Sequence, residues 1–109
     1  MTANERRLAQ RFDLRIPLSV RAPKSAAPEH RTESLNVSAR GIYFATNLPL
    51  REGMPVQVTF EMPEEITHKP AAEWRCTGHV VHVEPSNSRQ SSQQSMIRVG
   101  VGFDCYEVL

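Results

Sequence analysis

The chain has 109 residues, the length of one domain that can bury a hydrophobic core without disulfides or a structural metal. Only 39% of the residues are hydrophobic, and no run approaches the roughly 18 apolar residues that a membrane-spanning helix needs. No apolar stretch follows the N-terminal arginines, as a signal peptide would require. The composition therefore predicts a cytoplasmic protein that is neither exported nor inserted in a membrane, and we expect a monomer.

The net charge is only +1, but the positive charge is unevenly distributed. Residues 1–21 have a balance of +3, because Glu5 and Asp13 stand against five arginines: Arg6, Arg7, Arg11, Arg15 and Arg21. The whole chain uses 11 arginines and only two lysines. A guanidinium group matches a phosphate or a guanine edge with two parallel hydrogen bonds, whereas an ammonium group is a point charge. The bias favours a small anionic ligand over a nucleic acid polymer, although high-GC codon usage produces the same bias.

Alternation of apolar and polar residues dominates the chain and predicts short, half-buried strands. Ahead of them, residues 4–10 have the pattern of one helical turn with Asn4 as its N-cap, which is too short to be stable alone. The predicted strands cover residues 16–21, 34–38, 42–46, 56–62, 74–83 and 98–103, with a turn at 49–53. Residues 22–32 and 86–95 are rich in proline, small or polar residues. They are expected to be loops, the second a mobile hairpin loop.

The last two predicted strands show which residues face the core. In the final strand, Val99, Val101 and Phe103 point one way, while Gly100 and Gly102 point the other. In the strand before it, one face holds Trp74, Cys76, Gly78 and Val80. Glycines within strands suit a tightly bent sheet. Five to seven short strands without a long helical period indicate a closed antiparallel barrel or a sandwich.

Cys76 and Cys105 are the only cysteines, and they lack the C-x-x-C spacing of many redox and metal sites. We expect both to be buried, reduced thiols in a cytosolic chain. A disulfide between them is the alternative, which nothing in the sequence supports.

The first candidate site is the pair Arg7 and Arg11, four residues apart in the basic N-terminal segment. Whether this segment is helical or extended, a spacing of four places both side chains on the same side. Both guanidinium groups could therefore hold one anionic ligand. From the arginines alone, a solvated basic tail is the favoured alternative. Arg11 and Arg15 repeat the spacing, but Arg15 leads directly into the first strand, so we prefer Arg7 and Arg11.

The second candidate site is the segment Asn36-Val37-Ser38-Ala39-Arg40-Gly41 between two predicted strands. An ordinary turn uses the same residue types, and for this segment alone that alternative is favoured. On a strand, however, Asn36 and Ser38 project to the same face. The Asn36 amide offers a donor and an acceptor to a guanine edge, and Ser38 can donate to a phosphate oxygen. Gly41 can adopt a positive φ and lets the backbone approach a flat base closely.

In this order, the two segments resemble the PilZ domain family of bacterial cyclic di-GMP receptors. That family has an R-x-x-x-R segment, which Arg7-Leu8-Ala9-Gln10-Arg11 matches, and a [D/N]-x-S-x-x-G turn, which residues 36–41 match with asparagine in first place. The likeness continues through Arg11-Phe12, Gly41-Ile42-Tyr43-Phe44, Gly78-His79-Val80-Val81 and Gly100-Val101-Gly102-Phe103. It covers nearly the whole chain. Each motif is weak alone, whereas both together in a strand-rich chain of this length are specific.

The resemblance implies an all-β fold: a six-stranded antiparallel PilZ-type β-barrel over residues 15–109, preceded by a flexible N-terminal arginine arm over residues 1–14. It also implies a set of ligand-binding residues. Arg7 and Arg11 would contact phosphate and guanine, Asn36 and Ser38 would bond the guanine and phosphate edges, and Gly41 would pack near the base. Arg6 would add a contact that favours an intercalated ligand dimer over a single ligand. Arg40 is expected to face solvent, or to touch phosphate.

The function implied by the resemblance is that of a cyclic di-GMP receptor or adaptor, with cyclic di-GMP as a ligand and no catalytic cofactor. Ligand phosphates would neutralise the mobile arm and dock it on the barrel, which would alter a surface for a separate partner protein. One alternative is a PilZ-like adaptor that binds no nucleotide. Another is a small barrel that binds single-stranded nucleic acid, for which few of the seven aromatic residues are expected outside the core.

Catalysis and metal binding are not expected. His79 and His82 are three residues apart on a predicted strand, so they should face opposite sides and fail to chelate one metal. Ser38 has no identifiable general base, and no Ser-His-acid order stands out. The acidic residues Glu61, Glu64 and Glu65 near a Met-Pro pair are expected to form a solvated turn.

Overall fold

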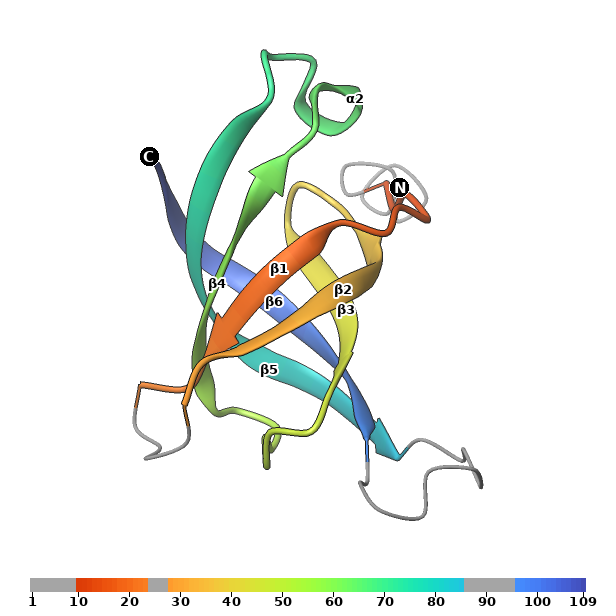
Figure 1. Cartoon of the computed structure of the whole chain (residues 1–109), viewed down its shortest axis with the longest axis vertical. Coiled ribbons are helices and arrows are strands. Elements are labelled where there is room, and N and C mark those ends of the chain that lie inside the picture. Colours follow the sequence, from red (N-terminus) through yellow and green to blue (C-terminus); the bar gives the residue numbers. More distant parts are fainter. Residues whose placement is uncertain (1–9, 24–27, 86–95) are drawn as a thin grey trace, which may run out of the picture.

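The computed structural model describes residues 10–23, 28–85 and 96–109. This part of the chain forms six strands and a short helix: β1 (Pro17–Arg21), β2 (His30–Val37), β3 (Gly41–Thr46), β4 (Pro55–Met62), α2 (Glu64–Thr67), β5 (Ala72–Pro85) and β6 (Ile97–Val108). Neighbouring strands are antiparallel and close into a barrel in the order β1-β2-β3-β6-β5-β4 (Figure 1). The prediction of an all-β, six-stranded antiparallel barrel is confirmed.

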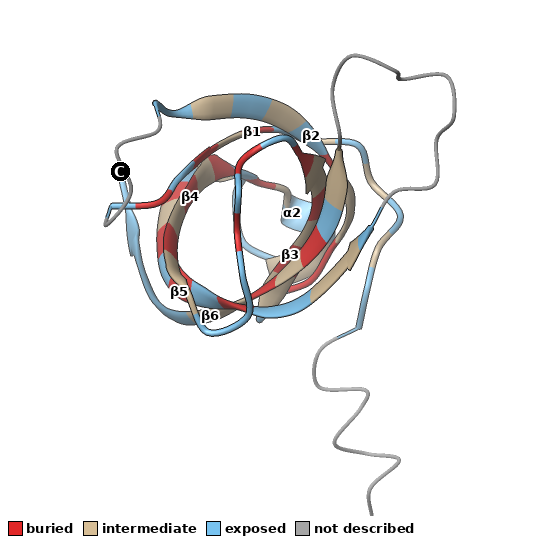
Figure 2. Cartoon of the chain, turned by 90° about the horizontal axis from the view of Figure 1, so that it is seen from below, coloured by how far each residue is buried: buried red, intermediate tan, exposed pale blue. Residues whose placement is uncertain are grey.

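The barrel interior is filled by the apolar residues of the alternating pattern, and Figure 2 shows buried positions on the inner side of the ring of strands. Burial of a valine, leucine, isoleucine, phenylalanine or methionine side chain contributes about 1.5–3 kcal/mol to the stability of the fold. The alternation therefore decides which face of each strand points inward. On the two long strands the expected inward residues are confirmed: Trp74, Cys76, Gly78 and Val80 on β5 and Val99 and Val101 on β6 are buried, and Phe103 packs against this core.

Strand β2 begins at His30, so the prediction of a loop through residue 32 is wrong at its C-terminal end. Pairing with both neighbours extends the strand. Val20 of β1 lies opposite His30, and the Thr32 hydroxyl donates to the carbonyl oxygen of Ala45 on β3 at 2.9 Å. The strand thus gains partners on both sides that its own polar sequence does not reveal. The loop expected at 86–95 and most of the helical turn expected at 4–10 lie outside the described residues.

The segment after β4 is one turn of helix, α2, rather than only the solvated turn that its acidic residues predict. Glu64 and Glu65 are exposed, as expected. Ile66, however, packs against the barrel core. In Figure 2, α2 is seen through the ring of strands, at the far end of the barrel. One apolar side chain is what distinguishes this helical turn from a solvated loop.

A β-bulge in β5 changes which side chains face outward. The pairing with β6 places His79 opposite Gly102 and His82 opposite Gly100, so Val81 is an extra residue. Both histidines are exposed and lie on the outer face of the barrel. The expectation that they face opposite sides is therefore wrong, because it assumed unbroken alternation.

The two cysteines are free, with Cys76 buried and Cys105 exposed. The expectation that both are buried is wrong for Cys105, which lies opposite Thr77 on the outward-facing part of β6. Burial raises the pKa of the Cys76 thiol to about 12, with a smaller contribution from Cys105. Within the described residues, no helix has the length and apolar character needed to cross a membrane.

Candidate functional site

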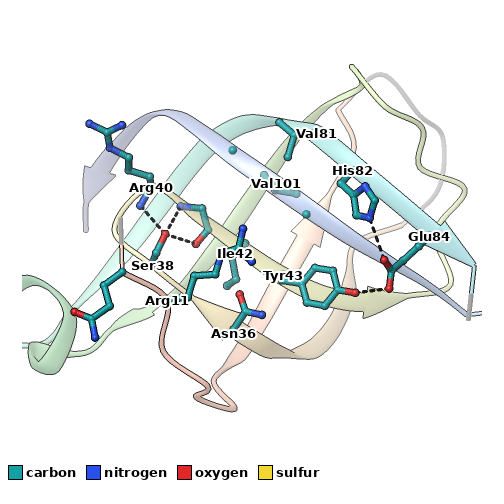
Figure 3. A pocket seen from close by; sticks show the side chains of 14 residues that line it. Arg11, Asn36, Ser38, Arg40, Ile42, Tyr43, Val81, His82, Glu84 and Val101 are labelled. Atoms are coloured by element: carbon teal, nitrogen blue, oxygen red, sulfur yellow. Dashed lines mark hydrogen bonds and ion pairs between the residues drawn. The ribbon is translucent and has the colours of Figure 1, made fainter. Parts of the chain in front are cut away.

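A groove of about 990 Å³ lies on the outer face of the barrel, over strands β3, β6 and β5. Its lining comes from four parts of the chain: the segment before β1, the stretch from the end of β2 through the corner into β3, the last part of β5, and the middle of β6. Figure 3 shows Ser38 and Arg40 at one end of the groove and His82 and Glu84 at the other. The groove therefore runs along the sheet rather than into the barrel.

The floor of the groove carries almost no side chains because Gly100 and Gly102 of β6 face outward there. Tyr43 lies across from Gly100 on β3, and His82 lies across from it on β5. Val81, the extra residue of the bulge, is 52% exposed beside this floor. A flat strip of backbone bordered by two rings and a valine suits a planar ligand.

Ser38 organises the corner between β2 and β3. Its hydroxyl oxygen accepts hydrogen bonds from the backbone N–H groups of Arg40 and Gly41, each at 3.1 Å. Its own backbone N–H donates to the carbonyl oxygen of Gly41 at 2.9 Å, and its hydroxyl group reaches the same oxygen at 3.4 Å. The side chain is buried, yet it lines the groove. Ser38 thus holds the corner in shape, and the long 3.4 Å contact leaves its proton free for a stronger acceptor.

Gly41 is required by the packing of the strands. A β-carbon at this position would lie 2.6 Å from the backbone carbonyl oxygen of Val101 on β6. Gly41 does not adopt the positive φ that a glycine allows; the glycine with a positive φ is Gly53, at 87°. Gly41 lines the groove as expected, but its missing side chain lets β3 approach β6 at the register Gly41–Gly102.

The segment before β1 is hydrogen-bonded to the end of β2 through Phe12. The backbone N–H of Phe12 donates to the carbonyl oxygen of Val37 at 2.8 Å, and the Val37 N–H donates back at 3.0 Å. Further along, the Ser34 hydroxyl accepts a hydrogen bond from the backbone N–H of Ile16 at 2.9 Å. Arg11 is next to this attachment, is exposed, and lines the groove. The attachment of Phe12 thus fixes the position of the Arg11 backbone beside the groove.

The structure brings most of the sequence-predicted site residues together. Arg11, Asn36, Ser38, Arg40 and Gly41 all line the groove, although they come from separate segments. Arg6 and Arg7 lie outside the described residues. Arg15, the alternative second arginine of the motif, is exposed but is not part of the lining.

Sequence reasoning missed a polar cluster at the other end of the groove, which we call the Glu84 cluster: Tyr43, His82, Glu84 and Arg98. The Tyr43 hydroxyl donates to Oε1 of Glu84 at 2.7 Å, and Nε2 of His82 lies 3.0 Å from Oε2. An Arg98 guanidinium nitrogen lies 3.6 Å from Oε1. These residues come from three strands and share no motif. The available signal was the pair of outward glycines on β6, whose cross-strand neighbours include Tyr43 and His82.

Hydrogen bonds and burial shift the pKa values of two residues in this cluster, Glu84 and Tyr43. The bond from Tyr43 and then the contact with His82 lower the pKa of Glu84. Burial, and then the hydrogen bond to Glu84, raise the pKa of Tyr43. A carboxylate therefore faces one end of the groove, while the guanidinium groups of Arg11 and Arg40 lie toward the other. Within the described residues, no group of three or more metal-ligating side chains lies together. This geometry is suited to binding a ligand that has both an anionic part and hydrogen-bond donors.

Comparison with known proteins relates the chain to one family. The family model described as PilZ domain matches residues 5–107. A comparison with curated proteins found no match. Among solved structures, the fold is similar to that in "Structure of Bacillus subtilis Inhibitor of motility (MotI/DgrA)", with a TM-score of 0.63 and 19% sequence identity. That similarity covers 93% of this chain but only 43% of the Bacillus subtilis chain.

Proposed function

The chain belongs to the PilZ domain family, and we propose from this that its groove is a receptor site for cyclic di-GMP. The observation that carries the proposal is the meeting of Arg11 with the corner formed by Asn36, Ser38 and Gly41. These two segments are far apart in the sequence, and the barrel places both against one groove. The family resemblance drew on the same two segments, so the motif residues and the geometry support the same ligand.

Each lining residue at this end has a chemical role in the proposal. The Arg11 guanidinium group pairs with phosphate or with the acceptor edge of guanine through two parallel hydrogen bonds. The Asn36 amide bonds a guanine edge, and Ser38 turns its hydroxyl proton from Gly41 to a phosphate oxygen. Arg40, exposed at the rim, adds positive charge beside the phosphates. Arg6 and Arg7, which lie outside the described residues, are proposed to add further contacts from the preceding segment.

The size of the groove is compatible with this ligand. Its volume of about 990 Å³ is at the upper end of the roughly 300–1,000 Å³ typical of small-molecule sites. Of the seven aromatic residues in the chain, all within the described part, Tyr43 alone lines the groove. A site for single-stranded nucleic acid would instead need several stacking platforms along a basic surface. The groove therefore favours a compact nucleotide over a polymer.

We propose that binding alters a surface that a partner protein recognises in the cytoplasm. The phosphates would neutralise the arginines of residues 1–14 and hold that segment against the barrel. Phe12 and Val37 already attach the end of this segment next to Arg11, so ligand contacts made by the preceding arginines would act directly beside the groove. The output is thus a change in the shape and charge of the barrel surface, transmitted by a monomer to a separate protein.

Calorimetric titration with cyclic di-GMP tests the receptor, with GMP and cyclic di-AMP as comparison ligands. We expect Arg11→Ala to weaken cyclic di-GMP binding by roughly 10- to 150-fold, the value of one charge-assisted hydrogen bond. Arg15→Ala is the matched control, because Arg15 is exposed on the same segment but does not line the groove. Equal losses in both variants would indicate general charge attraction and contradict the assigned site. Absence of heat and of amide shifts with the wild-type chain would instead indicate an adaptor that binds no nucleotide.

A further inference from the structure

The Glu84 end of the groove contains a slot that is bounded on three sides. Gly100 forms its base, with Tyr43 opposite on β3 and His82 opposite on β5. A β-carbon at Gly100 would lie 3.7 Å from Cβ of His82 and 3.9 Å from Cδ1 of Tyr43, so these two side chains begin directly beside the glycine. The Glu84 carboxylate stands at the rim of the slot (Figure 3).

The carboxylate is oriented and still has acceptor capacity. Each of its two oxygens has two lone pairs. Among the described residues, Oε1 accepts one hydrogen bond, from Tyr43, and Oε2 makes one contact, with His82. Arg98 adds an ion pair at 3.6 Å, which is too long for a hydrogen bond. These described partners leave one lone pair on each oxygen unengaged, and the two oxygens together can accept from a pair of adjacent donors.

Guanine presents such a pair. Its N1–H and its exocyclic amino group lie side by side on one edge, and a carboxylate accepts from both at once. Adenine presents an amino donor next to an unprotonated N1, whose lone pair would face a carboxylate oxygen. A site built to accept two donors rejects the analogue that lacks one, because a buried or oriented polar group is then left unpaired.

The distance between the Gly41 corner and Glu84 is short enough for one cyclic dinucleotide to contact both. Gly102 lies opposite Gly41, and Arg98 lies opposite Glu84, four residues further along β6. At about 3.3 Å per residue, the two ends of the groove are separated by about 13 Å. A cyclic dinucleotide carries two bases on one ring of phosphates, so phosphates held at the corner leave a base free to extend toward Glu84.

Building on the proposed function, we infer that Glu84 is a specificity-determining residue that binds the Watson–Crick edge of a guanine lying over Gly100. Tyr43 and His82 position the carboxylate through their contacts with its two oxygens. At the other end of the groove, Ser38 and Arg40 bind phosphate, which guanine and adenine dinucleotides share, while Asn36 bonds the second guanine. Glu84 therefore contributes selection between bases rather than general affinity.

The test measures the dissociation constants of cyclic di-GMP and cyclic di-AMP for the wild-type chain and for Glu84→Gln. A glutamine amide offers one donor and one acceptor, which suits adenine and leaves guanine with one unmatched donor. We expect the wild-type preference for cyclic di-GMP to fall by roughly tenfold or more in Glu84→Gln. Glu107→Gln is the matched control, because Glu107 is an exposed glutamate of β6, paired with Arg75 at 3.1 Å, and does not line the groove. The ratio of the dissociation constants of cyclic di-AMP and cyclic di-GMP should be the same in Glu107→Gln as in the wild type.

The outcomes separate this inference from the proposed function. A wild-type chain that binds cyclic di-GMP, with an unchanged ratio in Glu84→Gln, overturns the role of Glu84 and leaves the receptor intact. An equal loss of both ligands also overturns it, since the cluster would then only shape the groove. A wild-type chain that binds neither ligand overturns the proposed function itself. Tyr43→Phe, which removes one hydrogen bond that orients the carboxylate, provides a second variant and should lower the ratio by a smaller factor.

Discussion

Replacing Gly41 by alanine tests whether the corner glycine is needed by the barrel or by the ligand. A β-carbon at this position would lie 2.6 Å from the carbonyl oxygen of Val101, a backbone atom that cannot rotate away. At Gly100, by contrast, the nearest atoms are side-chain carbons of His82 and Val81 at 3.7 Å. Both glycines line the groove, so Gly100→Ala is the matched control.

The expected size of the effect follows from the contact. The β-carbon of Gly41→Ala must retreat by about 0.8 Å to reach the ordinary limit of 3.4 Å, which separates β3 from β6. Overpacking of this kind costs about 1–3 kcal/mol. For 109 residues, an unfolding entropy of about 2.1 cal/mol/K per residue gives a shift in Tm of about 4 °C for each kcal/mol. We therefore expect Gly41→Ala to lower Tm by about 4–13 °C.

Gly100→Ala should behave in the opposite way. Its methyl group meets no clash and restricts the unfolded chain, so Tm should stay constant or rise by about 2–4 °C. The same methyl group stands on the floor of the groove and should weaken cyclic di-GMP binding. Thermal unfolding followed by circular dichroism, together with calorimetric titration of both variants, measures the two effects separately. A Gly41→Ala protein that melts at the wild-type temperature would refute the strand-packing role.

Two further predictions concern titratable groups. A thiol reagent should modify the exposed Cys105 quickly and Cys76 only after unfolding, because Cys76 is buried and burial raises its pKa to about 12; two equal rates in native buffer would contradict this. The bond from Tyr43, followed by the contact with His82, lowers the pKa of Glu84. Its ionised form therefore stabilises the fold above the ordinary pKa of about 4.3, and this stabilisation is lost as the pH falls through the lowered value. The advantage in Tm of the wild type over Glu84→Gln should shrink between about pH 7 and about pH 3, and an advantage that grows on acidification would be incompatible with this sign.

The alternation of apolar and polar residues was enough to predict the six strands and the inward faces of most of them. A closed barrel has one interior, so the stretch of each strand that lines this interior keeps one face apolar. Trp74, Cys76 and Val80 on β5 and Val99 and Val101 on β6 follow this rule. The limits of β2 could not be predicted in the same way, because its first residues are held by pairing with other strands and not by their own burial.

Two local features escaped sequence reasoning because they depend on contacts between strands. The bulge at Val81 is defined by the pairing of β5 with β6, and nothing in the sequence of β5 alone marks it. The need for glycine at position 41 comes from the carbonyl oxygen of Val101, a residue far away in the sequence. A turn motif predicts a glycine with a positive φ, whereas the tight approach of two strands requires a glycine for a different reason.

The candidate site was predictable where it is encoded in contiguous motifs. Arg11 and the segment with Asn36, Ser38 and Arg40 do line one groove, as their combination suggested. The Glu84 cluster was not predictable, since its members come from β3, β5 and β6 and share no motif. These residues meet because of the register in which the strands pair. Alternation of apolar and polar residues does not determine this register, since a shift by two residues keeps the same face of each strand inward.

Because of the bulge at Val81, the side chains that line the groove depend on how many residues β5 has as well as on which residues they are. Continued alternation after Val80 would turn His82 toward the interior and Val83 outward. The extra residue reverses this phase, so that His82 and Glu84 face the groove while the residues before the bulge still fill the barrel. Gain or loss of one residue at this point would exchange the chemistry of one end of the groove and leave the core residues on the other side of the bulge in place. A one-residue insertion or deletion in β5 would therefore change which side chains face the groove without any substitution. A comparison of aligned side chains alone would overlook such a change.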